Sequence, residues 1–508
     1  MSLQALSTHP VSLFWDAVRQ YPDHGAACEY DERGRLLARI GYFALSQRVR
    51  SLAAYLATRF APGARIALSA PNTIDHVATY LAIQSAGLVW VPLNPSNGPQ
   101  LNAAALKKAG ADVVLAGDAE AAALSPLAPN VELIPALLPP APGFEPVMRQ
   151  PGDIMAIKFT GGSTGEPKGV IQSNRSVMAN IINMEERFGT QPLPVFLACS
   201  PLTHGASHFV LPTLARGGRL VLLHKPDTNL ILRLLREEAV TESFMAPTLI
   251  LRLCALVDRP VTAPTLRRII YGAAPFPAEQ LLRAQRVFGP RIAGLYGQTE
   301  APMTIAAITE DELTRPDLAN SVGRPGRVSE VAIISPDGQA LPPGETGEIA
   351  VRGPLVMDGY LGDRTRTLDT LRHGWLRTGD LGHLDAQGYL FITGRASDML
   401  ISGGYNIHPA EVEAALMTLP GVDEVCAFAV PDPQWGERLE AAITPYRGAR
   451  PDTGQLLLLA KALLGPVKTP KALHVLDRLP RNPVGKVTRS AVRGVVYPPP
   501  AESGPASS

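Results

Sequence analysis

The sequence has little net charge and no long hydrophobic run, and both absences exclude classes of partner. Its 508 residues carry 47 Lys and Arg against 46 Asp and Glu, a net charge of +1 at pH 7. A broad surface for nucleic acid or an acidic membrane is therefore not expected. No apolar stretch approaches the ~20 residues of a membrane span, so we expect no integral membrane association. The first ten residues do not resemble a signal peptide, which favours a cytoplasmic location.

Cysteine is also scarce. Cys28, Cys199, Cys254 and Cys426 are far apart and lack the short spacings of metal-binding motifs. We expect buried free thiols rather than disulfides, in keeping with a reducing compartment.

The length predicts about two or three domains. Helical and strand patterns alternate from Tyr42 to about residue 320 in two similar halves, which predicts an α/β fold with a covered parallel sheet in each half. Residues 119–150, rich in Ala and Pro, are interpreted as a loose surface connection. Between about 321 and 394 the strands are short and turns are frequent, which predicts a small antiparallel sheet or β-barrel.

The C-terminal part has a different pattern. Residues 395–497 predict a compact α+β domain of about 100 residues, following an N-terminal domain over 1–394. The tail over 498–508 is rich in Pro, Ser and Ala and is predicted to be disordered.

One loop predicts phosphate binding. Residues 159–169 read Phe-Thr-Gly-Gly-Ser-Thr-Gly-Glu-Pro-Lys-Gly. Glycine lets backbone amides approach an anion, and hydroxyls and a lysine add donors. It is not a Walker A loop, because Pro167 precedes Lys168 and no Ser or Thr follows; an ordinary Gly/Ser/Thr loop is the alternative. The candidate phosphate ligands are Thr160, Gly161, Gly162, Ser163, Thr164, Gly165 and Lys168.

Five further segments follow this loop. They are Tyr-Gly-Gln-Thr-Glu at 296–300, Gly-Glu-Thr-Gly-Glu at 344–348, Trp-Leu-Arg-Thr-Gly-Asp at 375–380, Gly-Arg-Ala-Ser-Asp at 394–398 and Asn-Pro-Val-Gly-Lys at 482–486. Together, in this order, the six segments resemble the adenylate-forming (AMP-binding) superfamily, in its acyl-CoA synthetase and aryl-CoA ligase branch. The resemblance covers nearly the whole chain. It implies a large N-terminal domain of two αβαβα layers with a small β-barrel, and a small mobile C-terminal domain with a hinge near Ser397.

The resemblance implies an ATP-dependent acid–CoA ligase. A carboxylate attacks the α-phosphate of ATP to give acyl-AMP and pyrophosphate, and the thiol of CoA then takes the acyl group and releases AMP. Such a reaction brings anions together, so catalysis must come largely from positioning and positive electrostatics. Glu300 would bind Mg²⁺, for which oxygen ligands are suited, and Lys486 would reach the carboxylate and the α-phosphate. The implied catalytic residues are Thr160, Lys168, His204, Glu300 and Lys486.

The same resemblance assigns the nucleotide contacts. Tyr296 would stack on adenine, Asp380 would accept both ribose hydroxyls, and Arg395 would assist at the ribose or phosphate. The remaining implied contacts are Gly272, Ala273, Ala274, Pro275, Gly297, Gln298 and Thr299.

The CoA site would lie on another face of the C-terminal domain. Ser402, Gly403 and Gly404 resemble the loop that lines the pantetheine channel, and Trp435 resembles an aromatic residue near CoA, with a packing role as its alternative. Lys486 and this loop cannot both face one active site. In the family that the sequence resembles, the C-terminal domain rotates about its hinge between the two half-reactions.

The acid pocket is predicted to be apolar. His204 is the candidate gate, whereas His208 is interpreted as structural, and no carboxylate in 201–208 would receive a substrate amine. The expected lining residues are His204, Phe209, Tyr271, Gly272, Ala273, Gly297 and Met303. We therefore expect an apolar acid, either fatty or aryl. Transfer of the acyl group to a carrier protein, or a non-catalytic nucleotide-binding function, are the alternatives.

A Lys486→Ala substitution tests the two-face assignment. It should abolish formation of acyl-AMP, because the cation that neutralises the attacking carboxylate and α-phosphate is removed. Thioester formation from supplied acyl-AMP should be largely spared. Pyrophosphate release and thioester formation are measured separately, and an equal loss of both would contradict the assignment.

Overall fold

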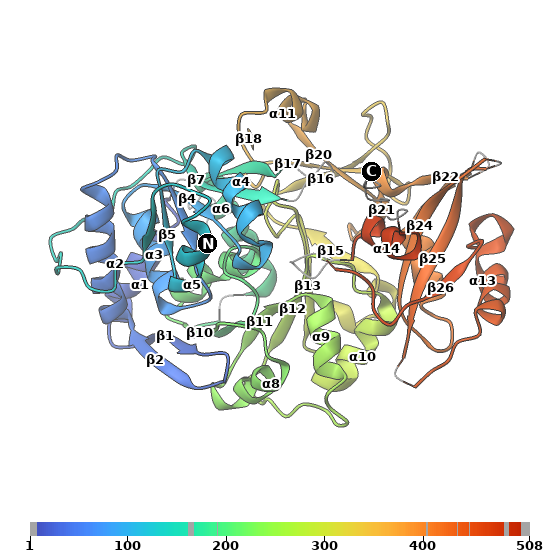
Figure 1. The fold of residues 1–508 in the computed structure, drawn as a ribbon, viewed down its shortest axis with the longest axis horizontal. Helices are drawn as coiled ribbons and strands as arrows, with labels where there is room; N and C mark the ends of the chain where they lie inside the picture. Colours follow the sequence, from blue (N-terminus) through green and yellow to red (C-terminus); the bar gives the residue numbers. More distant parts are fainter. Residues whose placement is uncertain are drawn as a thin grey trace, which may run out of the picture. The chain divides into compact units, whose positions relative to one another are not determined.

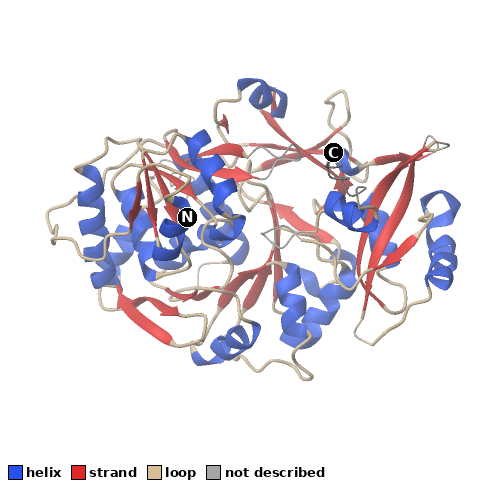
Figure 2. Cartoon of the chain, viewed as in Figure 1, coloured by secondary structure: helices blue, strands red, loops and turns tan. Residues whose placement is uncertain are grey.

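The computed structural model describes residues 8–160, 167–189, 191–402, 405–433, 435–446, 448–481 and 487–498. It is a mixed α/β protein whose contacts divide it into two compact units (Figures 1 and 2). The first unit holds the described residues up to Ala332 with Ala350–Thr378 and Leu384–Leu390; the second holds Ile333–Ile349, Gly379–His383 and the described residues from Phe391 onward. Because these units are defined by contacts, the predicted boundary at 394–395 for a moving domain stays a prediction. Apart from Pro498, the tail predicted to be disordered lies outside the described residues.

The first sheet of the first unit has seven strands in the order β18-β8-β7-β4-β3-β5-β6 (Figure 1). Its strands are β3 (Arg65–Ser69), β4 (Val89–Pro92), β5 (Val113–Ala116), β6 (Val131–Leu133), β7 (Ile154–Thr160), β8 (Lys168–Ser173) and β18 (Gly359–Tyr360). Strands β3 to β7 pair in parallel, whereas β8 runs antiparallel to β7 and β18 antiparallel to β8. The helices between them are α2 (Tyr42–Ala57), α3 (Ile74–Ser85), α4 (Pro99–Ala109) and α5 (Asp118–Leu124).

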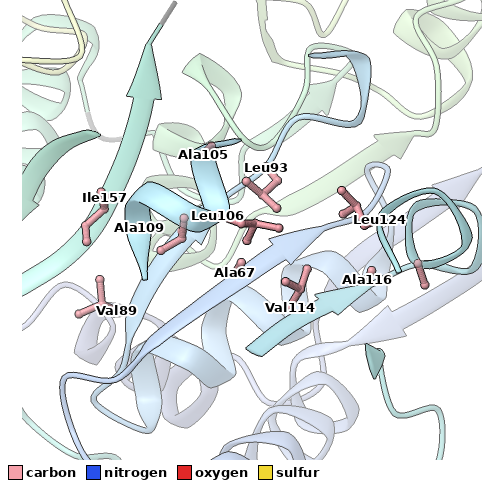
Figure 3. Packing of buried hydrophobic residues seen from close by; sticks show 12 residues of the cluster. Ala67, Val89, Leu93, Ala105, Leu106, Ala109, Val114, Ala116, Leu124 and Ile157 are labelled. Carbon is pink, nitrogen blue, oxygen red and sulfur yellow. The ribbon is translucent and has the colours of Figure 1, made fainter. Parts of the chain in front are cut away.

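Helix α4 packs on this sheet (Figure 3). It begins at Pro99, whose fixed φ suits a first helical position, and ends at Gly110, which adopts a left-handed conformation. Its Leu106 and Ala109 lie against Val114 and Ile157 of the strands, which are buried and apolar on this face. A parallel sheet covered by helices is therefore the physical basis of the alternating sequence pattern.

The second sheet of the first unit includes the path β13-β12-β11-β9-β10-β1-β2. Its strands are β1 (Gly25–Tyr30), β2 (Leu36–Gly41), β9 (Val195–Ala198), β10 (Arg219–Leu223), β11 (Glu242–Met245), β12 (Arg268–Tyr271) and β13 (Ile292–Tyr296). The helices along this part of the chain are α1 (Ser12–Gln20), α7 (Val210–Ala215), α8 (Thr228–Glu237), α9 (Pro247–Cys254) and α10 (Ala278–Phe288), whereas α6 (Asn174–Phe188) contacts β7 and β8 of the first sheet. Strands β1 and β9 to β13 pair in parallel, and the edge strand β2 is antiparallel. The two predicted halves thus correspond to two helix-covered sheets.

Short strands follow β13, as the turn-rich sequence predicted. They are β14 (Ala306–Ile308), β15 (Ser321–Pro325), β16 (Glu330–Ile334), β17 (Gly347–Arg352), β19 (Leu371–Arg372), β20 (Trp375–Leu384) and β21 (Leu390–Arg395), with helix α11 (Arg364–Thr370) among them. The division between the two units passes through β16, β17, β20 and β21. The small β-barrel stays a prediction.

The second unit has a five-stranded sheet with helices on both faces. Its elements are β22 (Leu400–Ser402), β23 (Tyr405–Ile407), α12 (Pro409–Leu416), β24 (Val422–Asp432), β25 (Gly436–Pro445), α13 (Thr453–Lys468), β26 (Leu473–Val475) and α14 (Arg489–Val496). Ala427 of β24 packs with Leu456 of α13, whereas its neighbour Phe428 packs with Val492 of α14. Because side chains alternate along a strand, these helices cover opposite faces (Figure 1).

Two expectations have clear outcomes. The four cysteines are free and buried, as predicted. Residues 119–150 were expected to be a loose connection, but most of α5 and all of β6 lie there; the short edge strand left too weak a pattern to detect. Among the described residues, no helix is long and apolar enough to cross a membrane.

Gly323 in β15 shows how closely the short strands pack. Its φ is +90°, and a Cβ there would collide with the carbonyl oxygen of Ala307 in β14. Gly323→Ala should therefore lower the thermal midpoint by about 5 °C or more, since both backbone strain and overlap with a paired strand must be relieved. Gly143→Ala, where a Cβ meets nothing within 4 Å, is the control and should leave the midpoint unchanged. Equal midpoints for the two variants would contradict this packing.

Candidate active site

The phosphate loop connects β7 to β8. Thr160 at the end of β7 pairs in register with Lys168 at the start of β8, so the loop closes an antiparallel hairpin. Thr160 and Lys168 are half-buried. The remaining proposed ligands of this loop, Gly161, Gly162, Ser163, Thr164 and Gly165, lie outside the described residues, as do Gly403, Gly404 and Lys486.

A second turn follows β13, where Tyr296 is buried at the strand end. The next residue must be glycine, because a Cβ on Gly297 would come within 2.5 Å of the backbone of Met303. Met303 itself has a φ of +58°, which is rare for a residue with a side chain. The Gln298 backbone amide donates to the carbonyl of Ala301 at 3.0 Å, and its side-chain amide donates to the carbonyl of Thr378 at 2.9 Å. The turn is therefore tightly fixed.

Glu300 ends this turn. One of its carboxylate oxygens accepts a hydrogen bond from the Tyr360 hydroxyl at 2.8 Å. Burial and the nearby Glu300 charge raise the pKa of Tyr360, so its hydroxyl stays a donor. A carboxylate has two oxygens and several lone pairs, so Glu300 can hold this bond and still contact a cation. Among the described residues, no group of three or more His, Cys, Asp or Glu could hold a metal ion. A metal here would take most of its ligands from phosphate and water, as Mg²⁺ commonly does.

A third turn follows β12. Tyr271 is buried at the end of that strand, edge-on to Phe276 with ring centroids 5.0 Å apart. Ala273 has a φ of +67°, a second unusual backbone conformation for a residue with a side chain. Backbone strain of this kind collects at functional sites. The expected adenine and acid contacts at 271–275 thus lie on a constrained, partly exposed turn.

His204 precedes the 3₁₀ helix η3 (Gly205–Phe209). Burial, together with the charge of Lys158, lowers its pKa to about 4, so the ring is neutral at pH 7. Its Nδ1 lies 2.9 Å from the Thr203 hydroxyl. Phe209, an expected pocket residue, belongs to a buried stack of rings with Phe196 and Phe244, at centroid distances of 4.8 and 5.5 Å.

Lys158 is a functional candidate that sequence analysis missed. It lies on β7, and its amine is 3.0 Å from the Ser207 hydroxyl and 2.8 Å from Nε2 of His208. The amine also lies over the Trp90 ring, 5.3 Å from its centroid. Burial lowers the pKa of Lys158 to about 7. The only sequence signal was a lysine inside an otherwise apolar strand, at a position that faces the same way as Ala156.

The second unit contains its own group of candidates. Asp380 is buried on β20 and accepts a hydrogen bond from Nε of Arg395 at 2.9 Å. Gly379, with a φ of +71°, donates its amide to Glu348 at 3.0 Å, which fixes the turn before Asp380. Two residues that sequence analysis assigned to the ribose are therefore in direct contact.

The expected CoA residues also come together in part. Ser402 pairs with Gly436, the residue after Trp435, so β22 and β25 bring the backbone of Ser402 next to the start of β25. Trp435 is exposed, and the amine of Lys471 lies 5.6 Å from its ring centroid.

The proposed hinge adjoins an anchored residue. Ser397 is exposed, whereas the next residue, Asp398, is held by the guanidinium of Arg489 at 2.6 Å. Arg489 also bonds Glu413 at 2.9 Å. Arg489 of α14 thus ties Asp398 to α12 within the second unit, and the hinge at Ser397 stays a prediction.

Comparisons with known proteins agree over most of the chain. The profile of the AMP-binding enzymes matches residues 14–361, and that of the AMP-binding enzyme C-terminal domain matches residues 411–486. A feruloyl-CoA synthase from Amycolatopsis is 36% identical over 462 residues, covering 89% of this chain and 93% of that protein. The medium/long-chain-fatty-acid–CoA ligase FadD8 of Mycobacterium tuberculosis is 36% identical over 356 residues, covering 68% of this chain and 61% of that protein.

A solved structure shows the same fold. The amide bond synthetase McbA from Marinactinospora thermotolerans is 30% identical and superposes with a TM-score of 0.87, covering 96% of this chain and 99% of that one. The expected fold, a large N-terminal and a small C-terminal α/β domain, is therefore confirmed.

Lys158 should make stability depend on pH. The unfolded amine keeps a pKa near 10.5, whereas the folded amine loses its proton near pH 7. Between these values the unfolded state binds more protons, so folding becomes more favourable as pH rises, by up to about 1.4 kcal/mol per pH unit. Lys158→Met should therefore be relatively more stable than the wild type at pH 7, and this advantage should shrink toward pH 9 in thermal unfolding.

The other titratable groups facing this amine do not ionise in that range. The pKa values of His204 and His208 are lowered by burial, and that of Tyr80 is raised by burial. Lys107→Met, at an exposed lysine, is the control and should give no such trend. Parallel pH curves for the wild type and Lys158→Met would contradict the burial of a titrating amine.

Proposed function

The chain belongs to the family of AMP-binding enzymes, and from this premise we propose which acid it activates and which residues carry each step. Its relatives and family profiles make it an ATP-dependent acid–CoA ligase that works through acyl-AMP. The proposal that follows concerns the roles of individual residues and the class of acid.

In the first half-reaction, the β7–β8 loop holds the β- and γ-phosphates of ATP. The register of Thr160 with Lys168 supports this role, because it directs a hydroxyl and a lysine to the ends of a Gly-rich loop. Tyr296 contacts adenine, and Asp380 with Arg395 holds the ribose. Lys486 neutralises the attacking carboxylate and the α-phosphate, which lowers the barrier between two anions.

Glu300 contacts Mg²⁺ in this proposal. Its fixed position at the end of the Gly297 turn and its bond to Tyr360 support a rigid oxygen ligand. When bound, Mg²⁺ neutralises charge on the phosphates.

In the second half-reaction, CoA approaches along the β22–β23 hairpin. The pairing of Ser402 with Gly436 and the exposed ring of the preceding Trp435 support this path. The acyl group leaves AMP for the thiol sulfur, so a thioester bond forms as the acyl–phosphate bond breaks. Rotation of the C-terminal domain at Ser397 removes Lys486 from the active site and brings this CoA-binding surface there instead. The ion pair that anchors Asp398 supports a hinge at the residue before it.

The acid is aryl rather than long-chain in this proposal. The carrying observation is the ring of Phe244, which lies 2.5 Å from the position of a Cβ on Gly205 and 2.9 Å from one on Gly272. Phe209 and Phe196 stack behind it. A long alkyl chain passing between His204 and Gly272 would have to displace these buried rings, whereas a shorter, flat aryl group could end at the edge of Phe244. The extensive match to a feruloyl-CoA synthase supports the same class.

Amide formation is a second candidate activity, because McbA has the same fold at 30% identity. Both activities share the acyl-AMP intermediate and differ only in the nucleophile. The two activities are therefore distinguished by which nucleophile, CoA or an amine, accepts the acyl group.

The test measures pyrophosphate and product over a panel of acids. We expect aryl and arylalkanoic acids to release pyrophosphate and to give a thioester with CoA, with decanoic acid at least about tenfold poorer in kcat/KM because it must enter the aromatic stack. A preference for decanoic acid would contradict the aryl assignment. An amide with a supplied amine, and no thioester with CoA, would favour the second candidate.

Glu300→Gln tests the proposed contact with Mg²⁺ in the first half-reaction, because it keeps the shape of the side chain and removes its charge. It should lower pyrophosphate release by about 100-fold or more, because a fixed charge beside the phosphates is lost. Glu345→Gln, at an exposed position, is the control and should retain wild-type rates. Wild-type activity in Glu300→Gln would overturn its proposed contact with Mg²⁺.

A further inference from the structure

A small buried cavity lies behind η3, between the first sheet and its covering helices. It measures about 20 Å³. A cavity needs about 10–15 Å³ to hold one water molecule or one hydroxyl group, so this cavity accepts a single oxygen atom. Much of its wall is apolar, with Tyr80, Val177, Ile181 and Leu211.

Polar side chains also line this cavity, namely those of Tyr80, Trp90, Lys158, Gln172, Ser207 and His208. Among them, Trp90, Lys158 and Gln172 are 3%, 7% and 1% exposed, so these three do not reach bulk water. The indole Nε1 of Trp90 and the amide Oε1 of Gln172 have no hydrogen-bond partner within the described chain. A buried polar group without a partner costs about 1–3 kcal/mol, so a site with two of them is incomplete.

Hydrogen bonding fixes which atoms are donors and acceptors. Nε2 of Gln172 donates to the carbonyl of Thr299 at 2.9 Å, which leaves its carbonyl Oε1 as the acceptor of the pair. The Trp90 indole can only donate. The amine of Lys158 is bonded to Ser207 and His208, and its protonated form has three N–H groups, so at least one N–H of the ammonium remains for a further acceptor.

A hydroxyl group matches this set. Its oxygen accepts from the indole and the amine, and its hydrogen is donated to Gln172. A carboxylate does not match, because it has three heavy atoms and no hydrogen to donate to Oε1. An alkyl group would leave all three polar groups unsatisfied.

The cavity also adjoins the proposed acid site. Gln172 bonds directly to Thr299 of the catalytic turn. On its other side, the Ser207 hydroxyl donates to the carbonyl of His204, the proposed gate, at 2.6 Å. One side chain therefore separates the cavity from each of two residues expected to contact the acid.

We propose that this cavity is a specificity subsite for a hydroxyl group carried on the aryl ring of the acid, received by Trp90, Lys158 and Gln172. The inference rests on the proposed acid–CoA ligase function and names the substrate class more closely. In the free protein a water molecule occupies the position, and the substrate hydroxyl replaces it with the same three hydrogen bonds. An acid without the hydroxyl would lose these bonds or trap the water.

The test compares 3-phenylpropanoic acid with its 3-hydroxyphenyl and 4-hydroxyphenyl analogues. Calorimetry gives the dissociation constant of each acid, and pyrophosphate release gives kcat/KM. We expect the wild type to prefer one hydroxylated isomer by at least about tenfold, since a hydrogen-bonding site discriminates against an analogue that leaves it unpaired. Trp90→Phe and Lys158→Met should each reduce that preference about tenfold, whereas Lys107→Met should retain it.

The preference, rather than the absolute rate, is the quantity that decides. A wild type without preference for either hydroxylated acid, or a preference that survives both substitutions, would show that the cavity holds only water and would overturn the inference. If Lys158→Met does not fold, Trp90→Phe decides alone, because it removes one N–H and keeps an aromatic ring. Binding that prefers the hydroxylated acid without any pyrophosphate release would support the subsite and contradict the proposed function.

Discussion

The antiparallel pairing of β7 with β8 is the constraint on which the proposed site depends. At one end of this hairpin, Thr160 and Lys168 flank the Gly-rich loop. Along its length, Lys158 and Gln172 project from the same face, because Ala156 pairs with Gln172 and Lys158 with Val170. One of these side chains bonds η3 and the other bonds the turn of Thr299. A single hairpin thus connects the loop proposed to bind phosphate, the proposed gate at His204 and the turn of Thr299, and a shift in its register would separate all three.

Backbone strain supports the same arrangement. Ala273 and Met303 both adopt positive φ, and both belong to turns that follow neighbouring parallel strands, β12 and β13. The close approach of Gly297 to Met303 leaves no space for a side chain. Conformations of this kind persist only where the surroundings hold them, and the buried sheet beneath supplies that support. The turns are therefore preorganised. Preorganisation is a main source of rate acceleration in an enzyme that must bring a carboxylate to a triphosphate.

The sequence predicted the parts of this molecule that depend on local pattern. The alternation of helices and buried strands gave the two covered sheets, because each strand is apolar on both faces and each helix on one. The motif order gave the family; Asp380 and Arg395 are in contact in the structure, whereas their roles at the ribose stay a prediction. The edge strands β2 and β6 were not predicted, since edge strands pair on one side and carry a weaker hydrophobic pattern; β1, which pairs with both β10 and β2, was not predicted either. The roles of Lys486 and the loop at 161–166 rest on the resemblance alone.

Lys158 was beyond sequence reasoning for a different reason. A lysine in a strand is normally directed to solvent, and only the packing of α6 and η3 on this hairpin turns it into a buried amine. Its desolvation is unfavourable, and hydrogen bonds to Ser207 and His208 offset only part of that cost. Methionine would fill the same volume without this penalty, so the fold alone gives no reason for an amine here. The unpaired indole and amide beside it carry the same unfavourable term. Three such groups around one small cavity offset one another only when an oxygen that both accepts and donates lies between them. Water meets that requirement in the free protein, so the site selects an acid whose own hydroxyl remakes the bonds that the water gives up, and it rejects an acid that leaves them unmade.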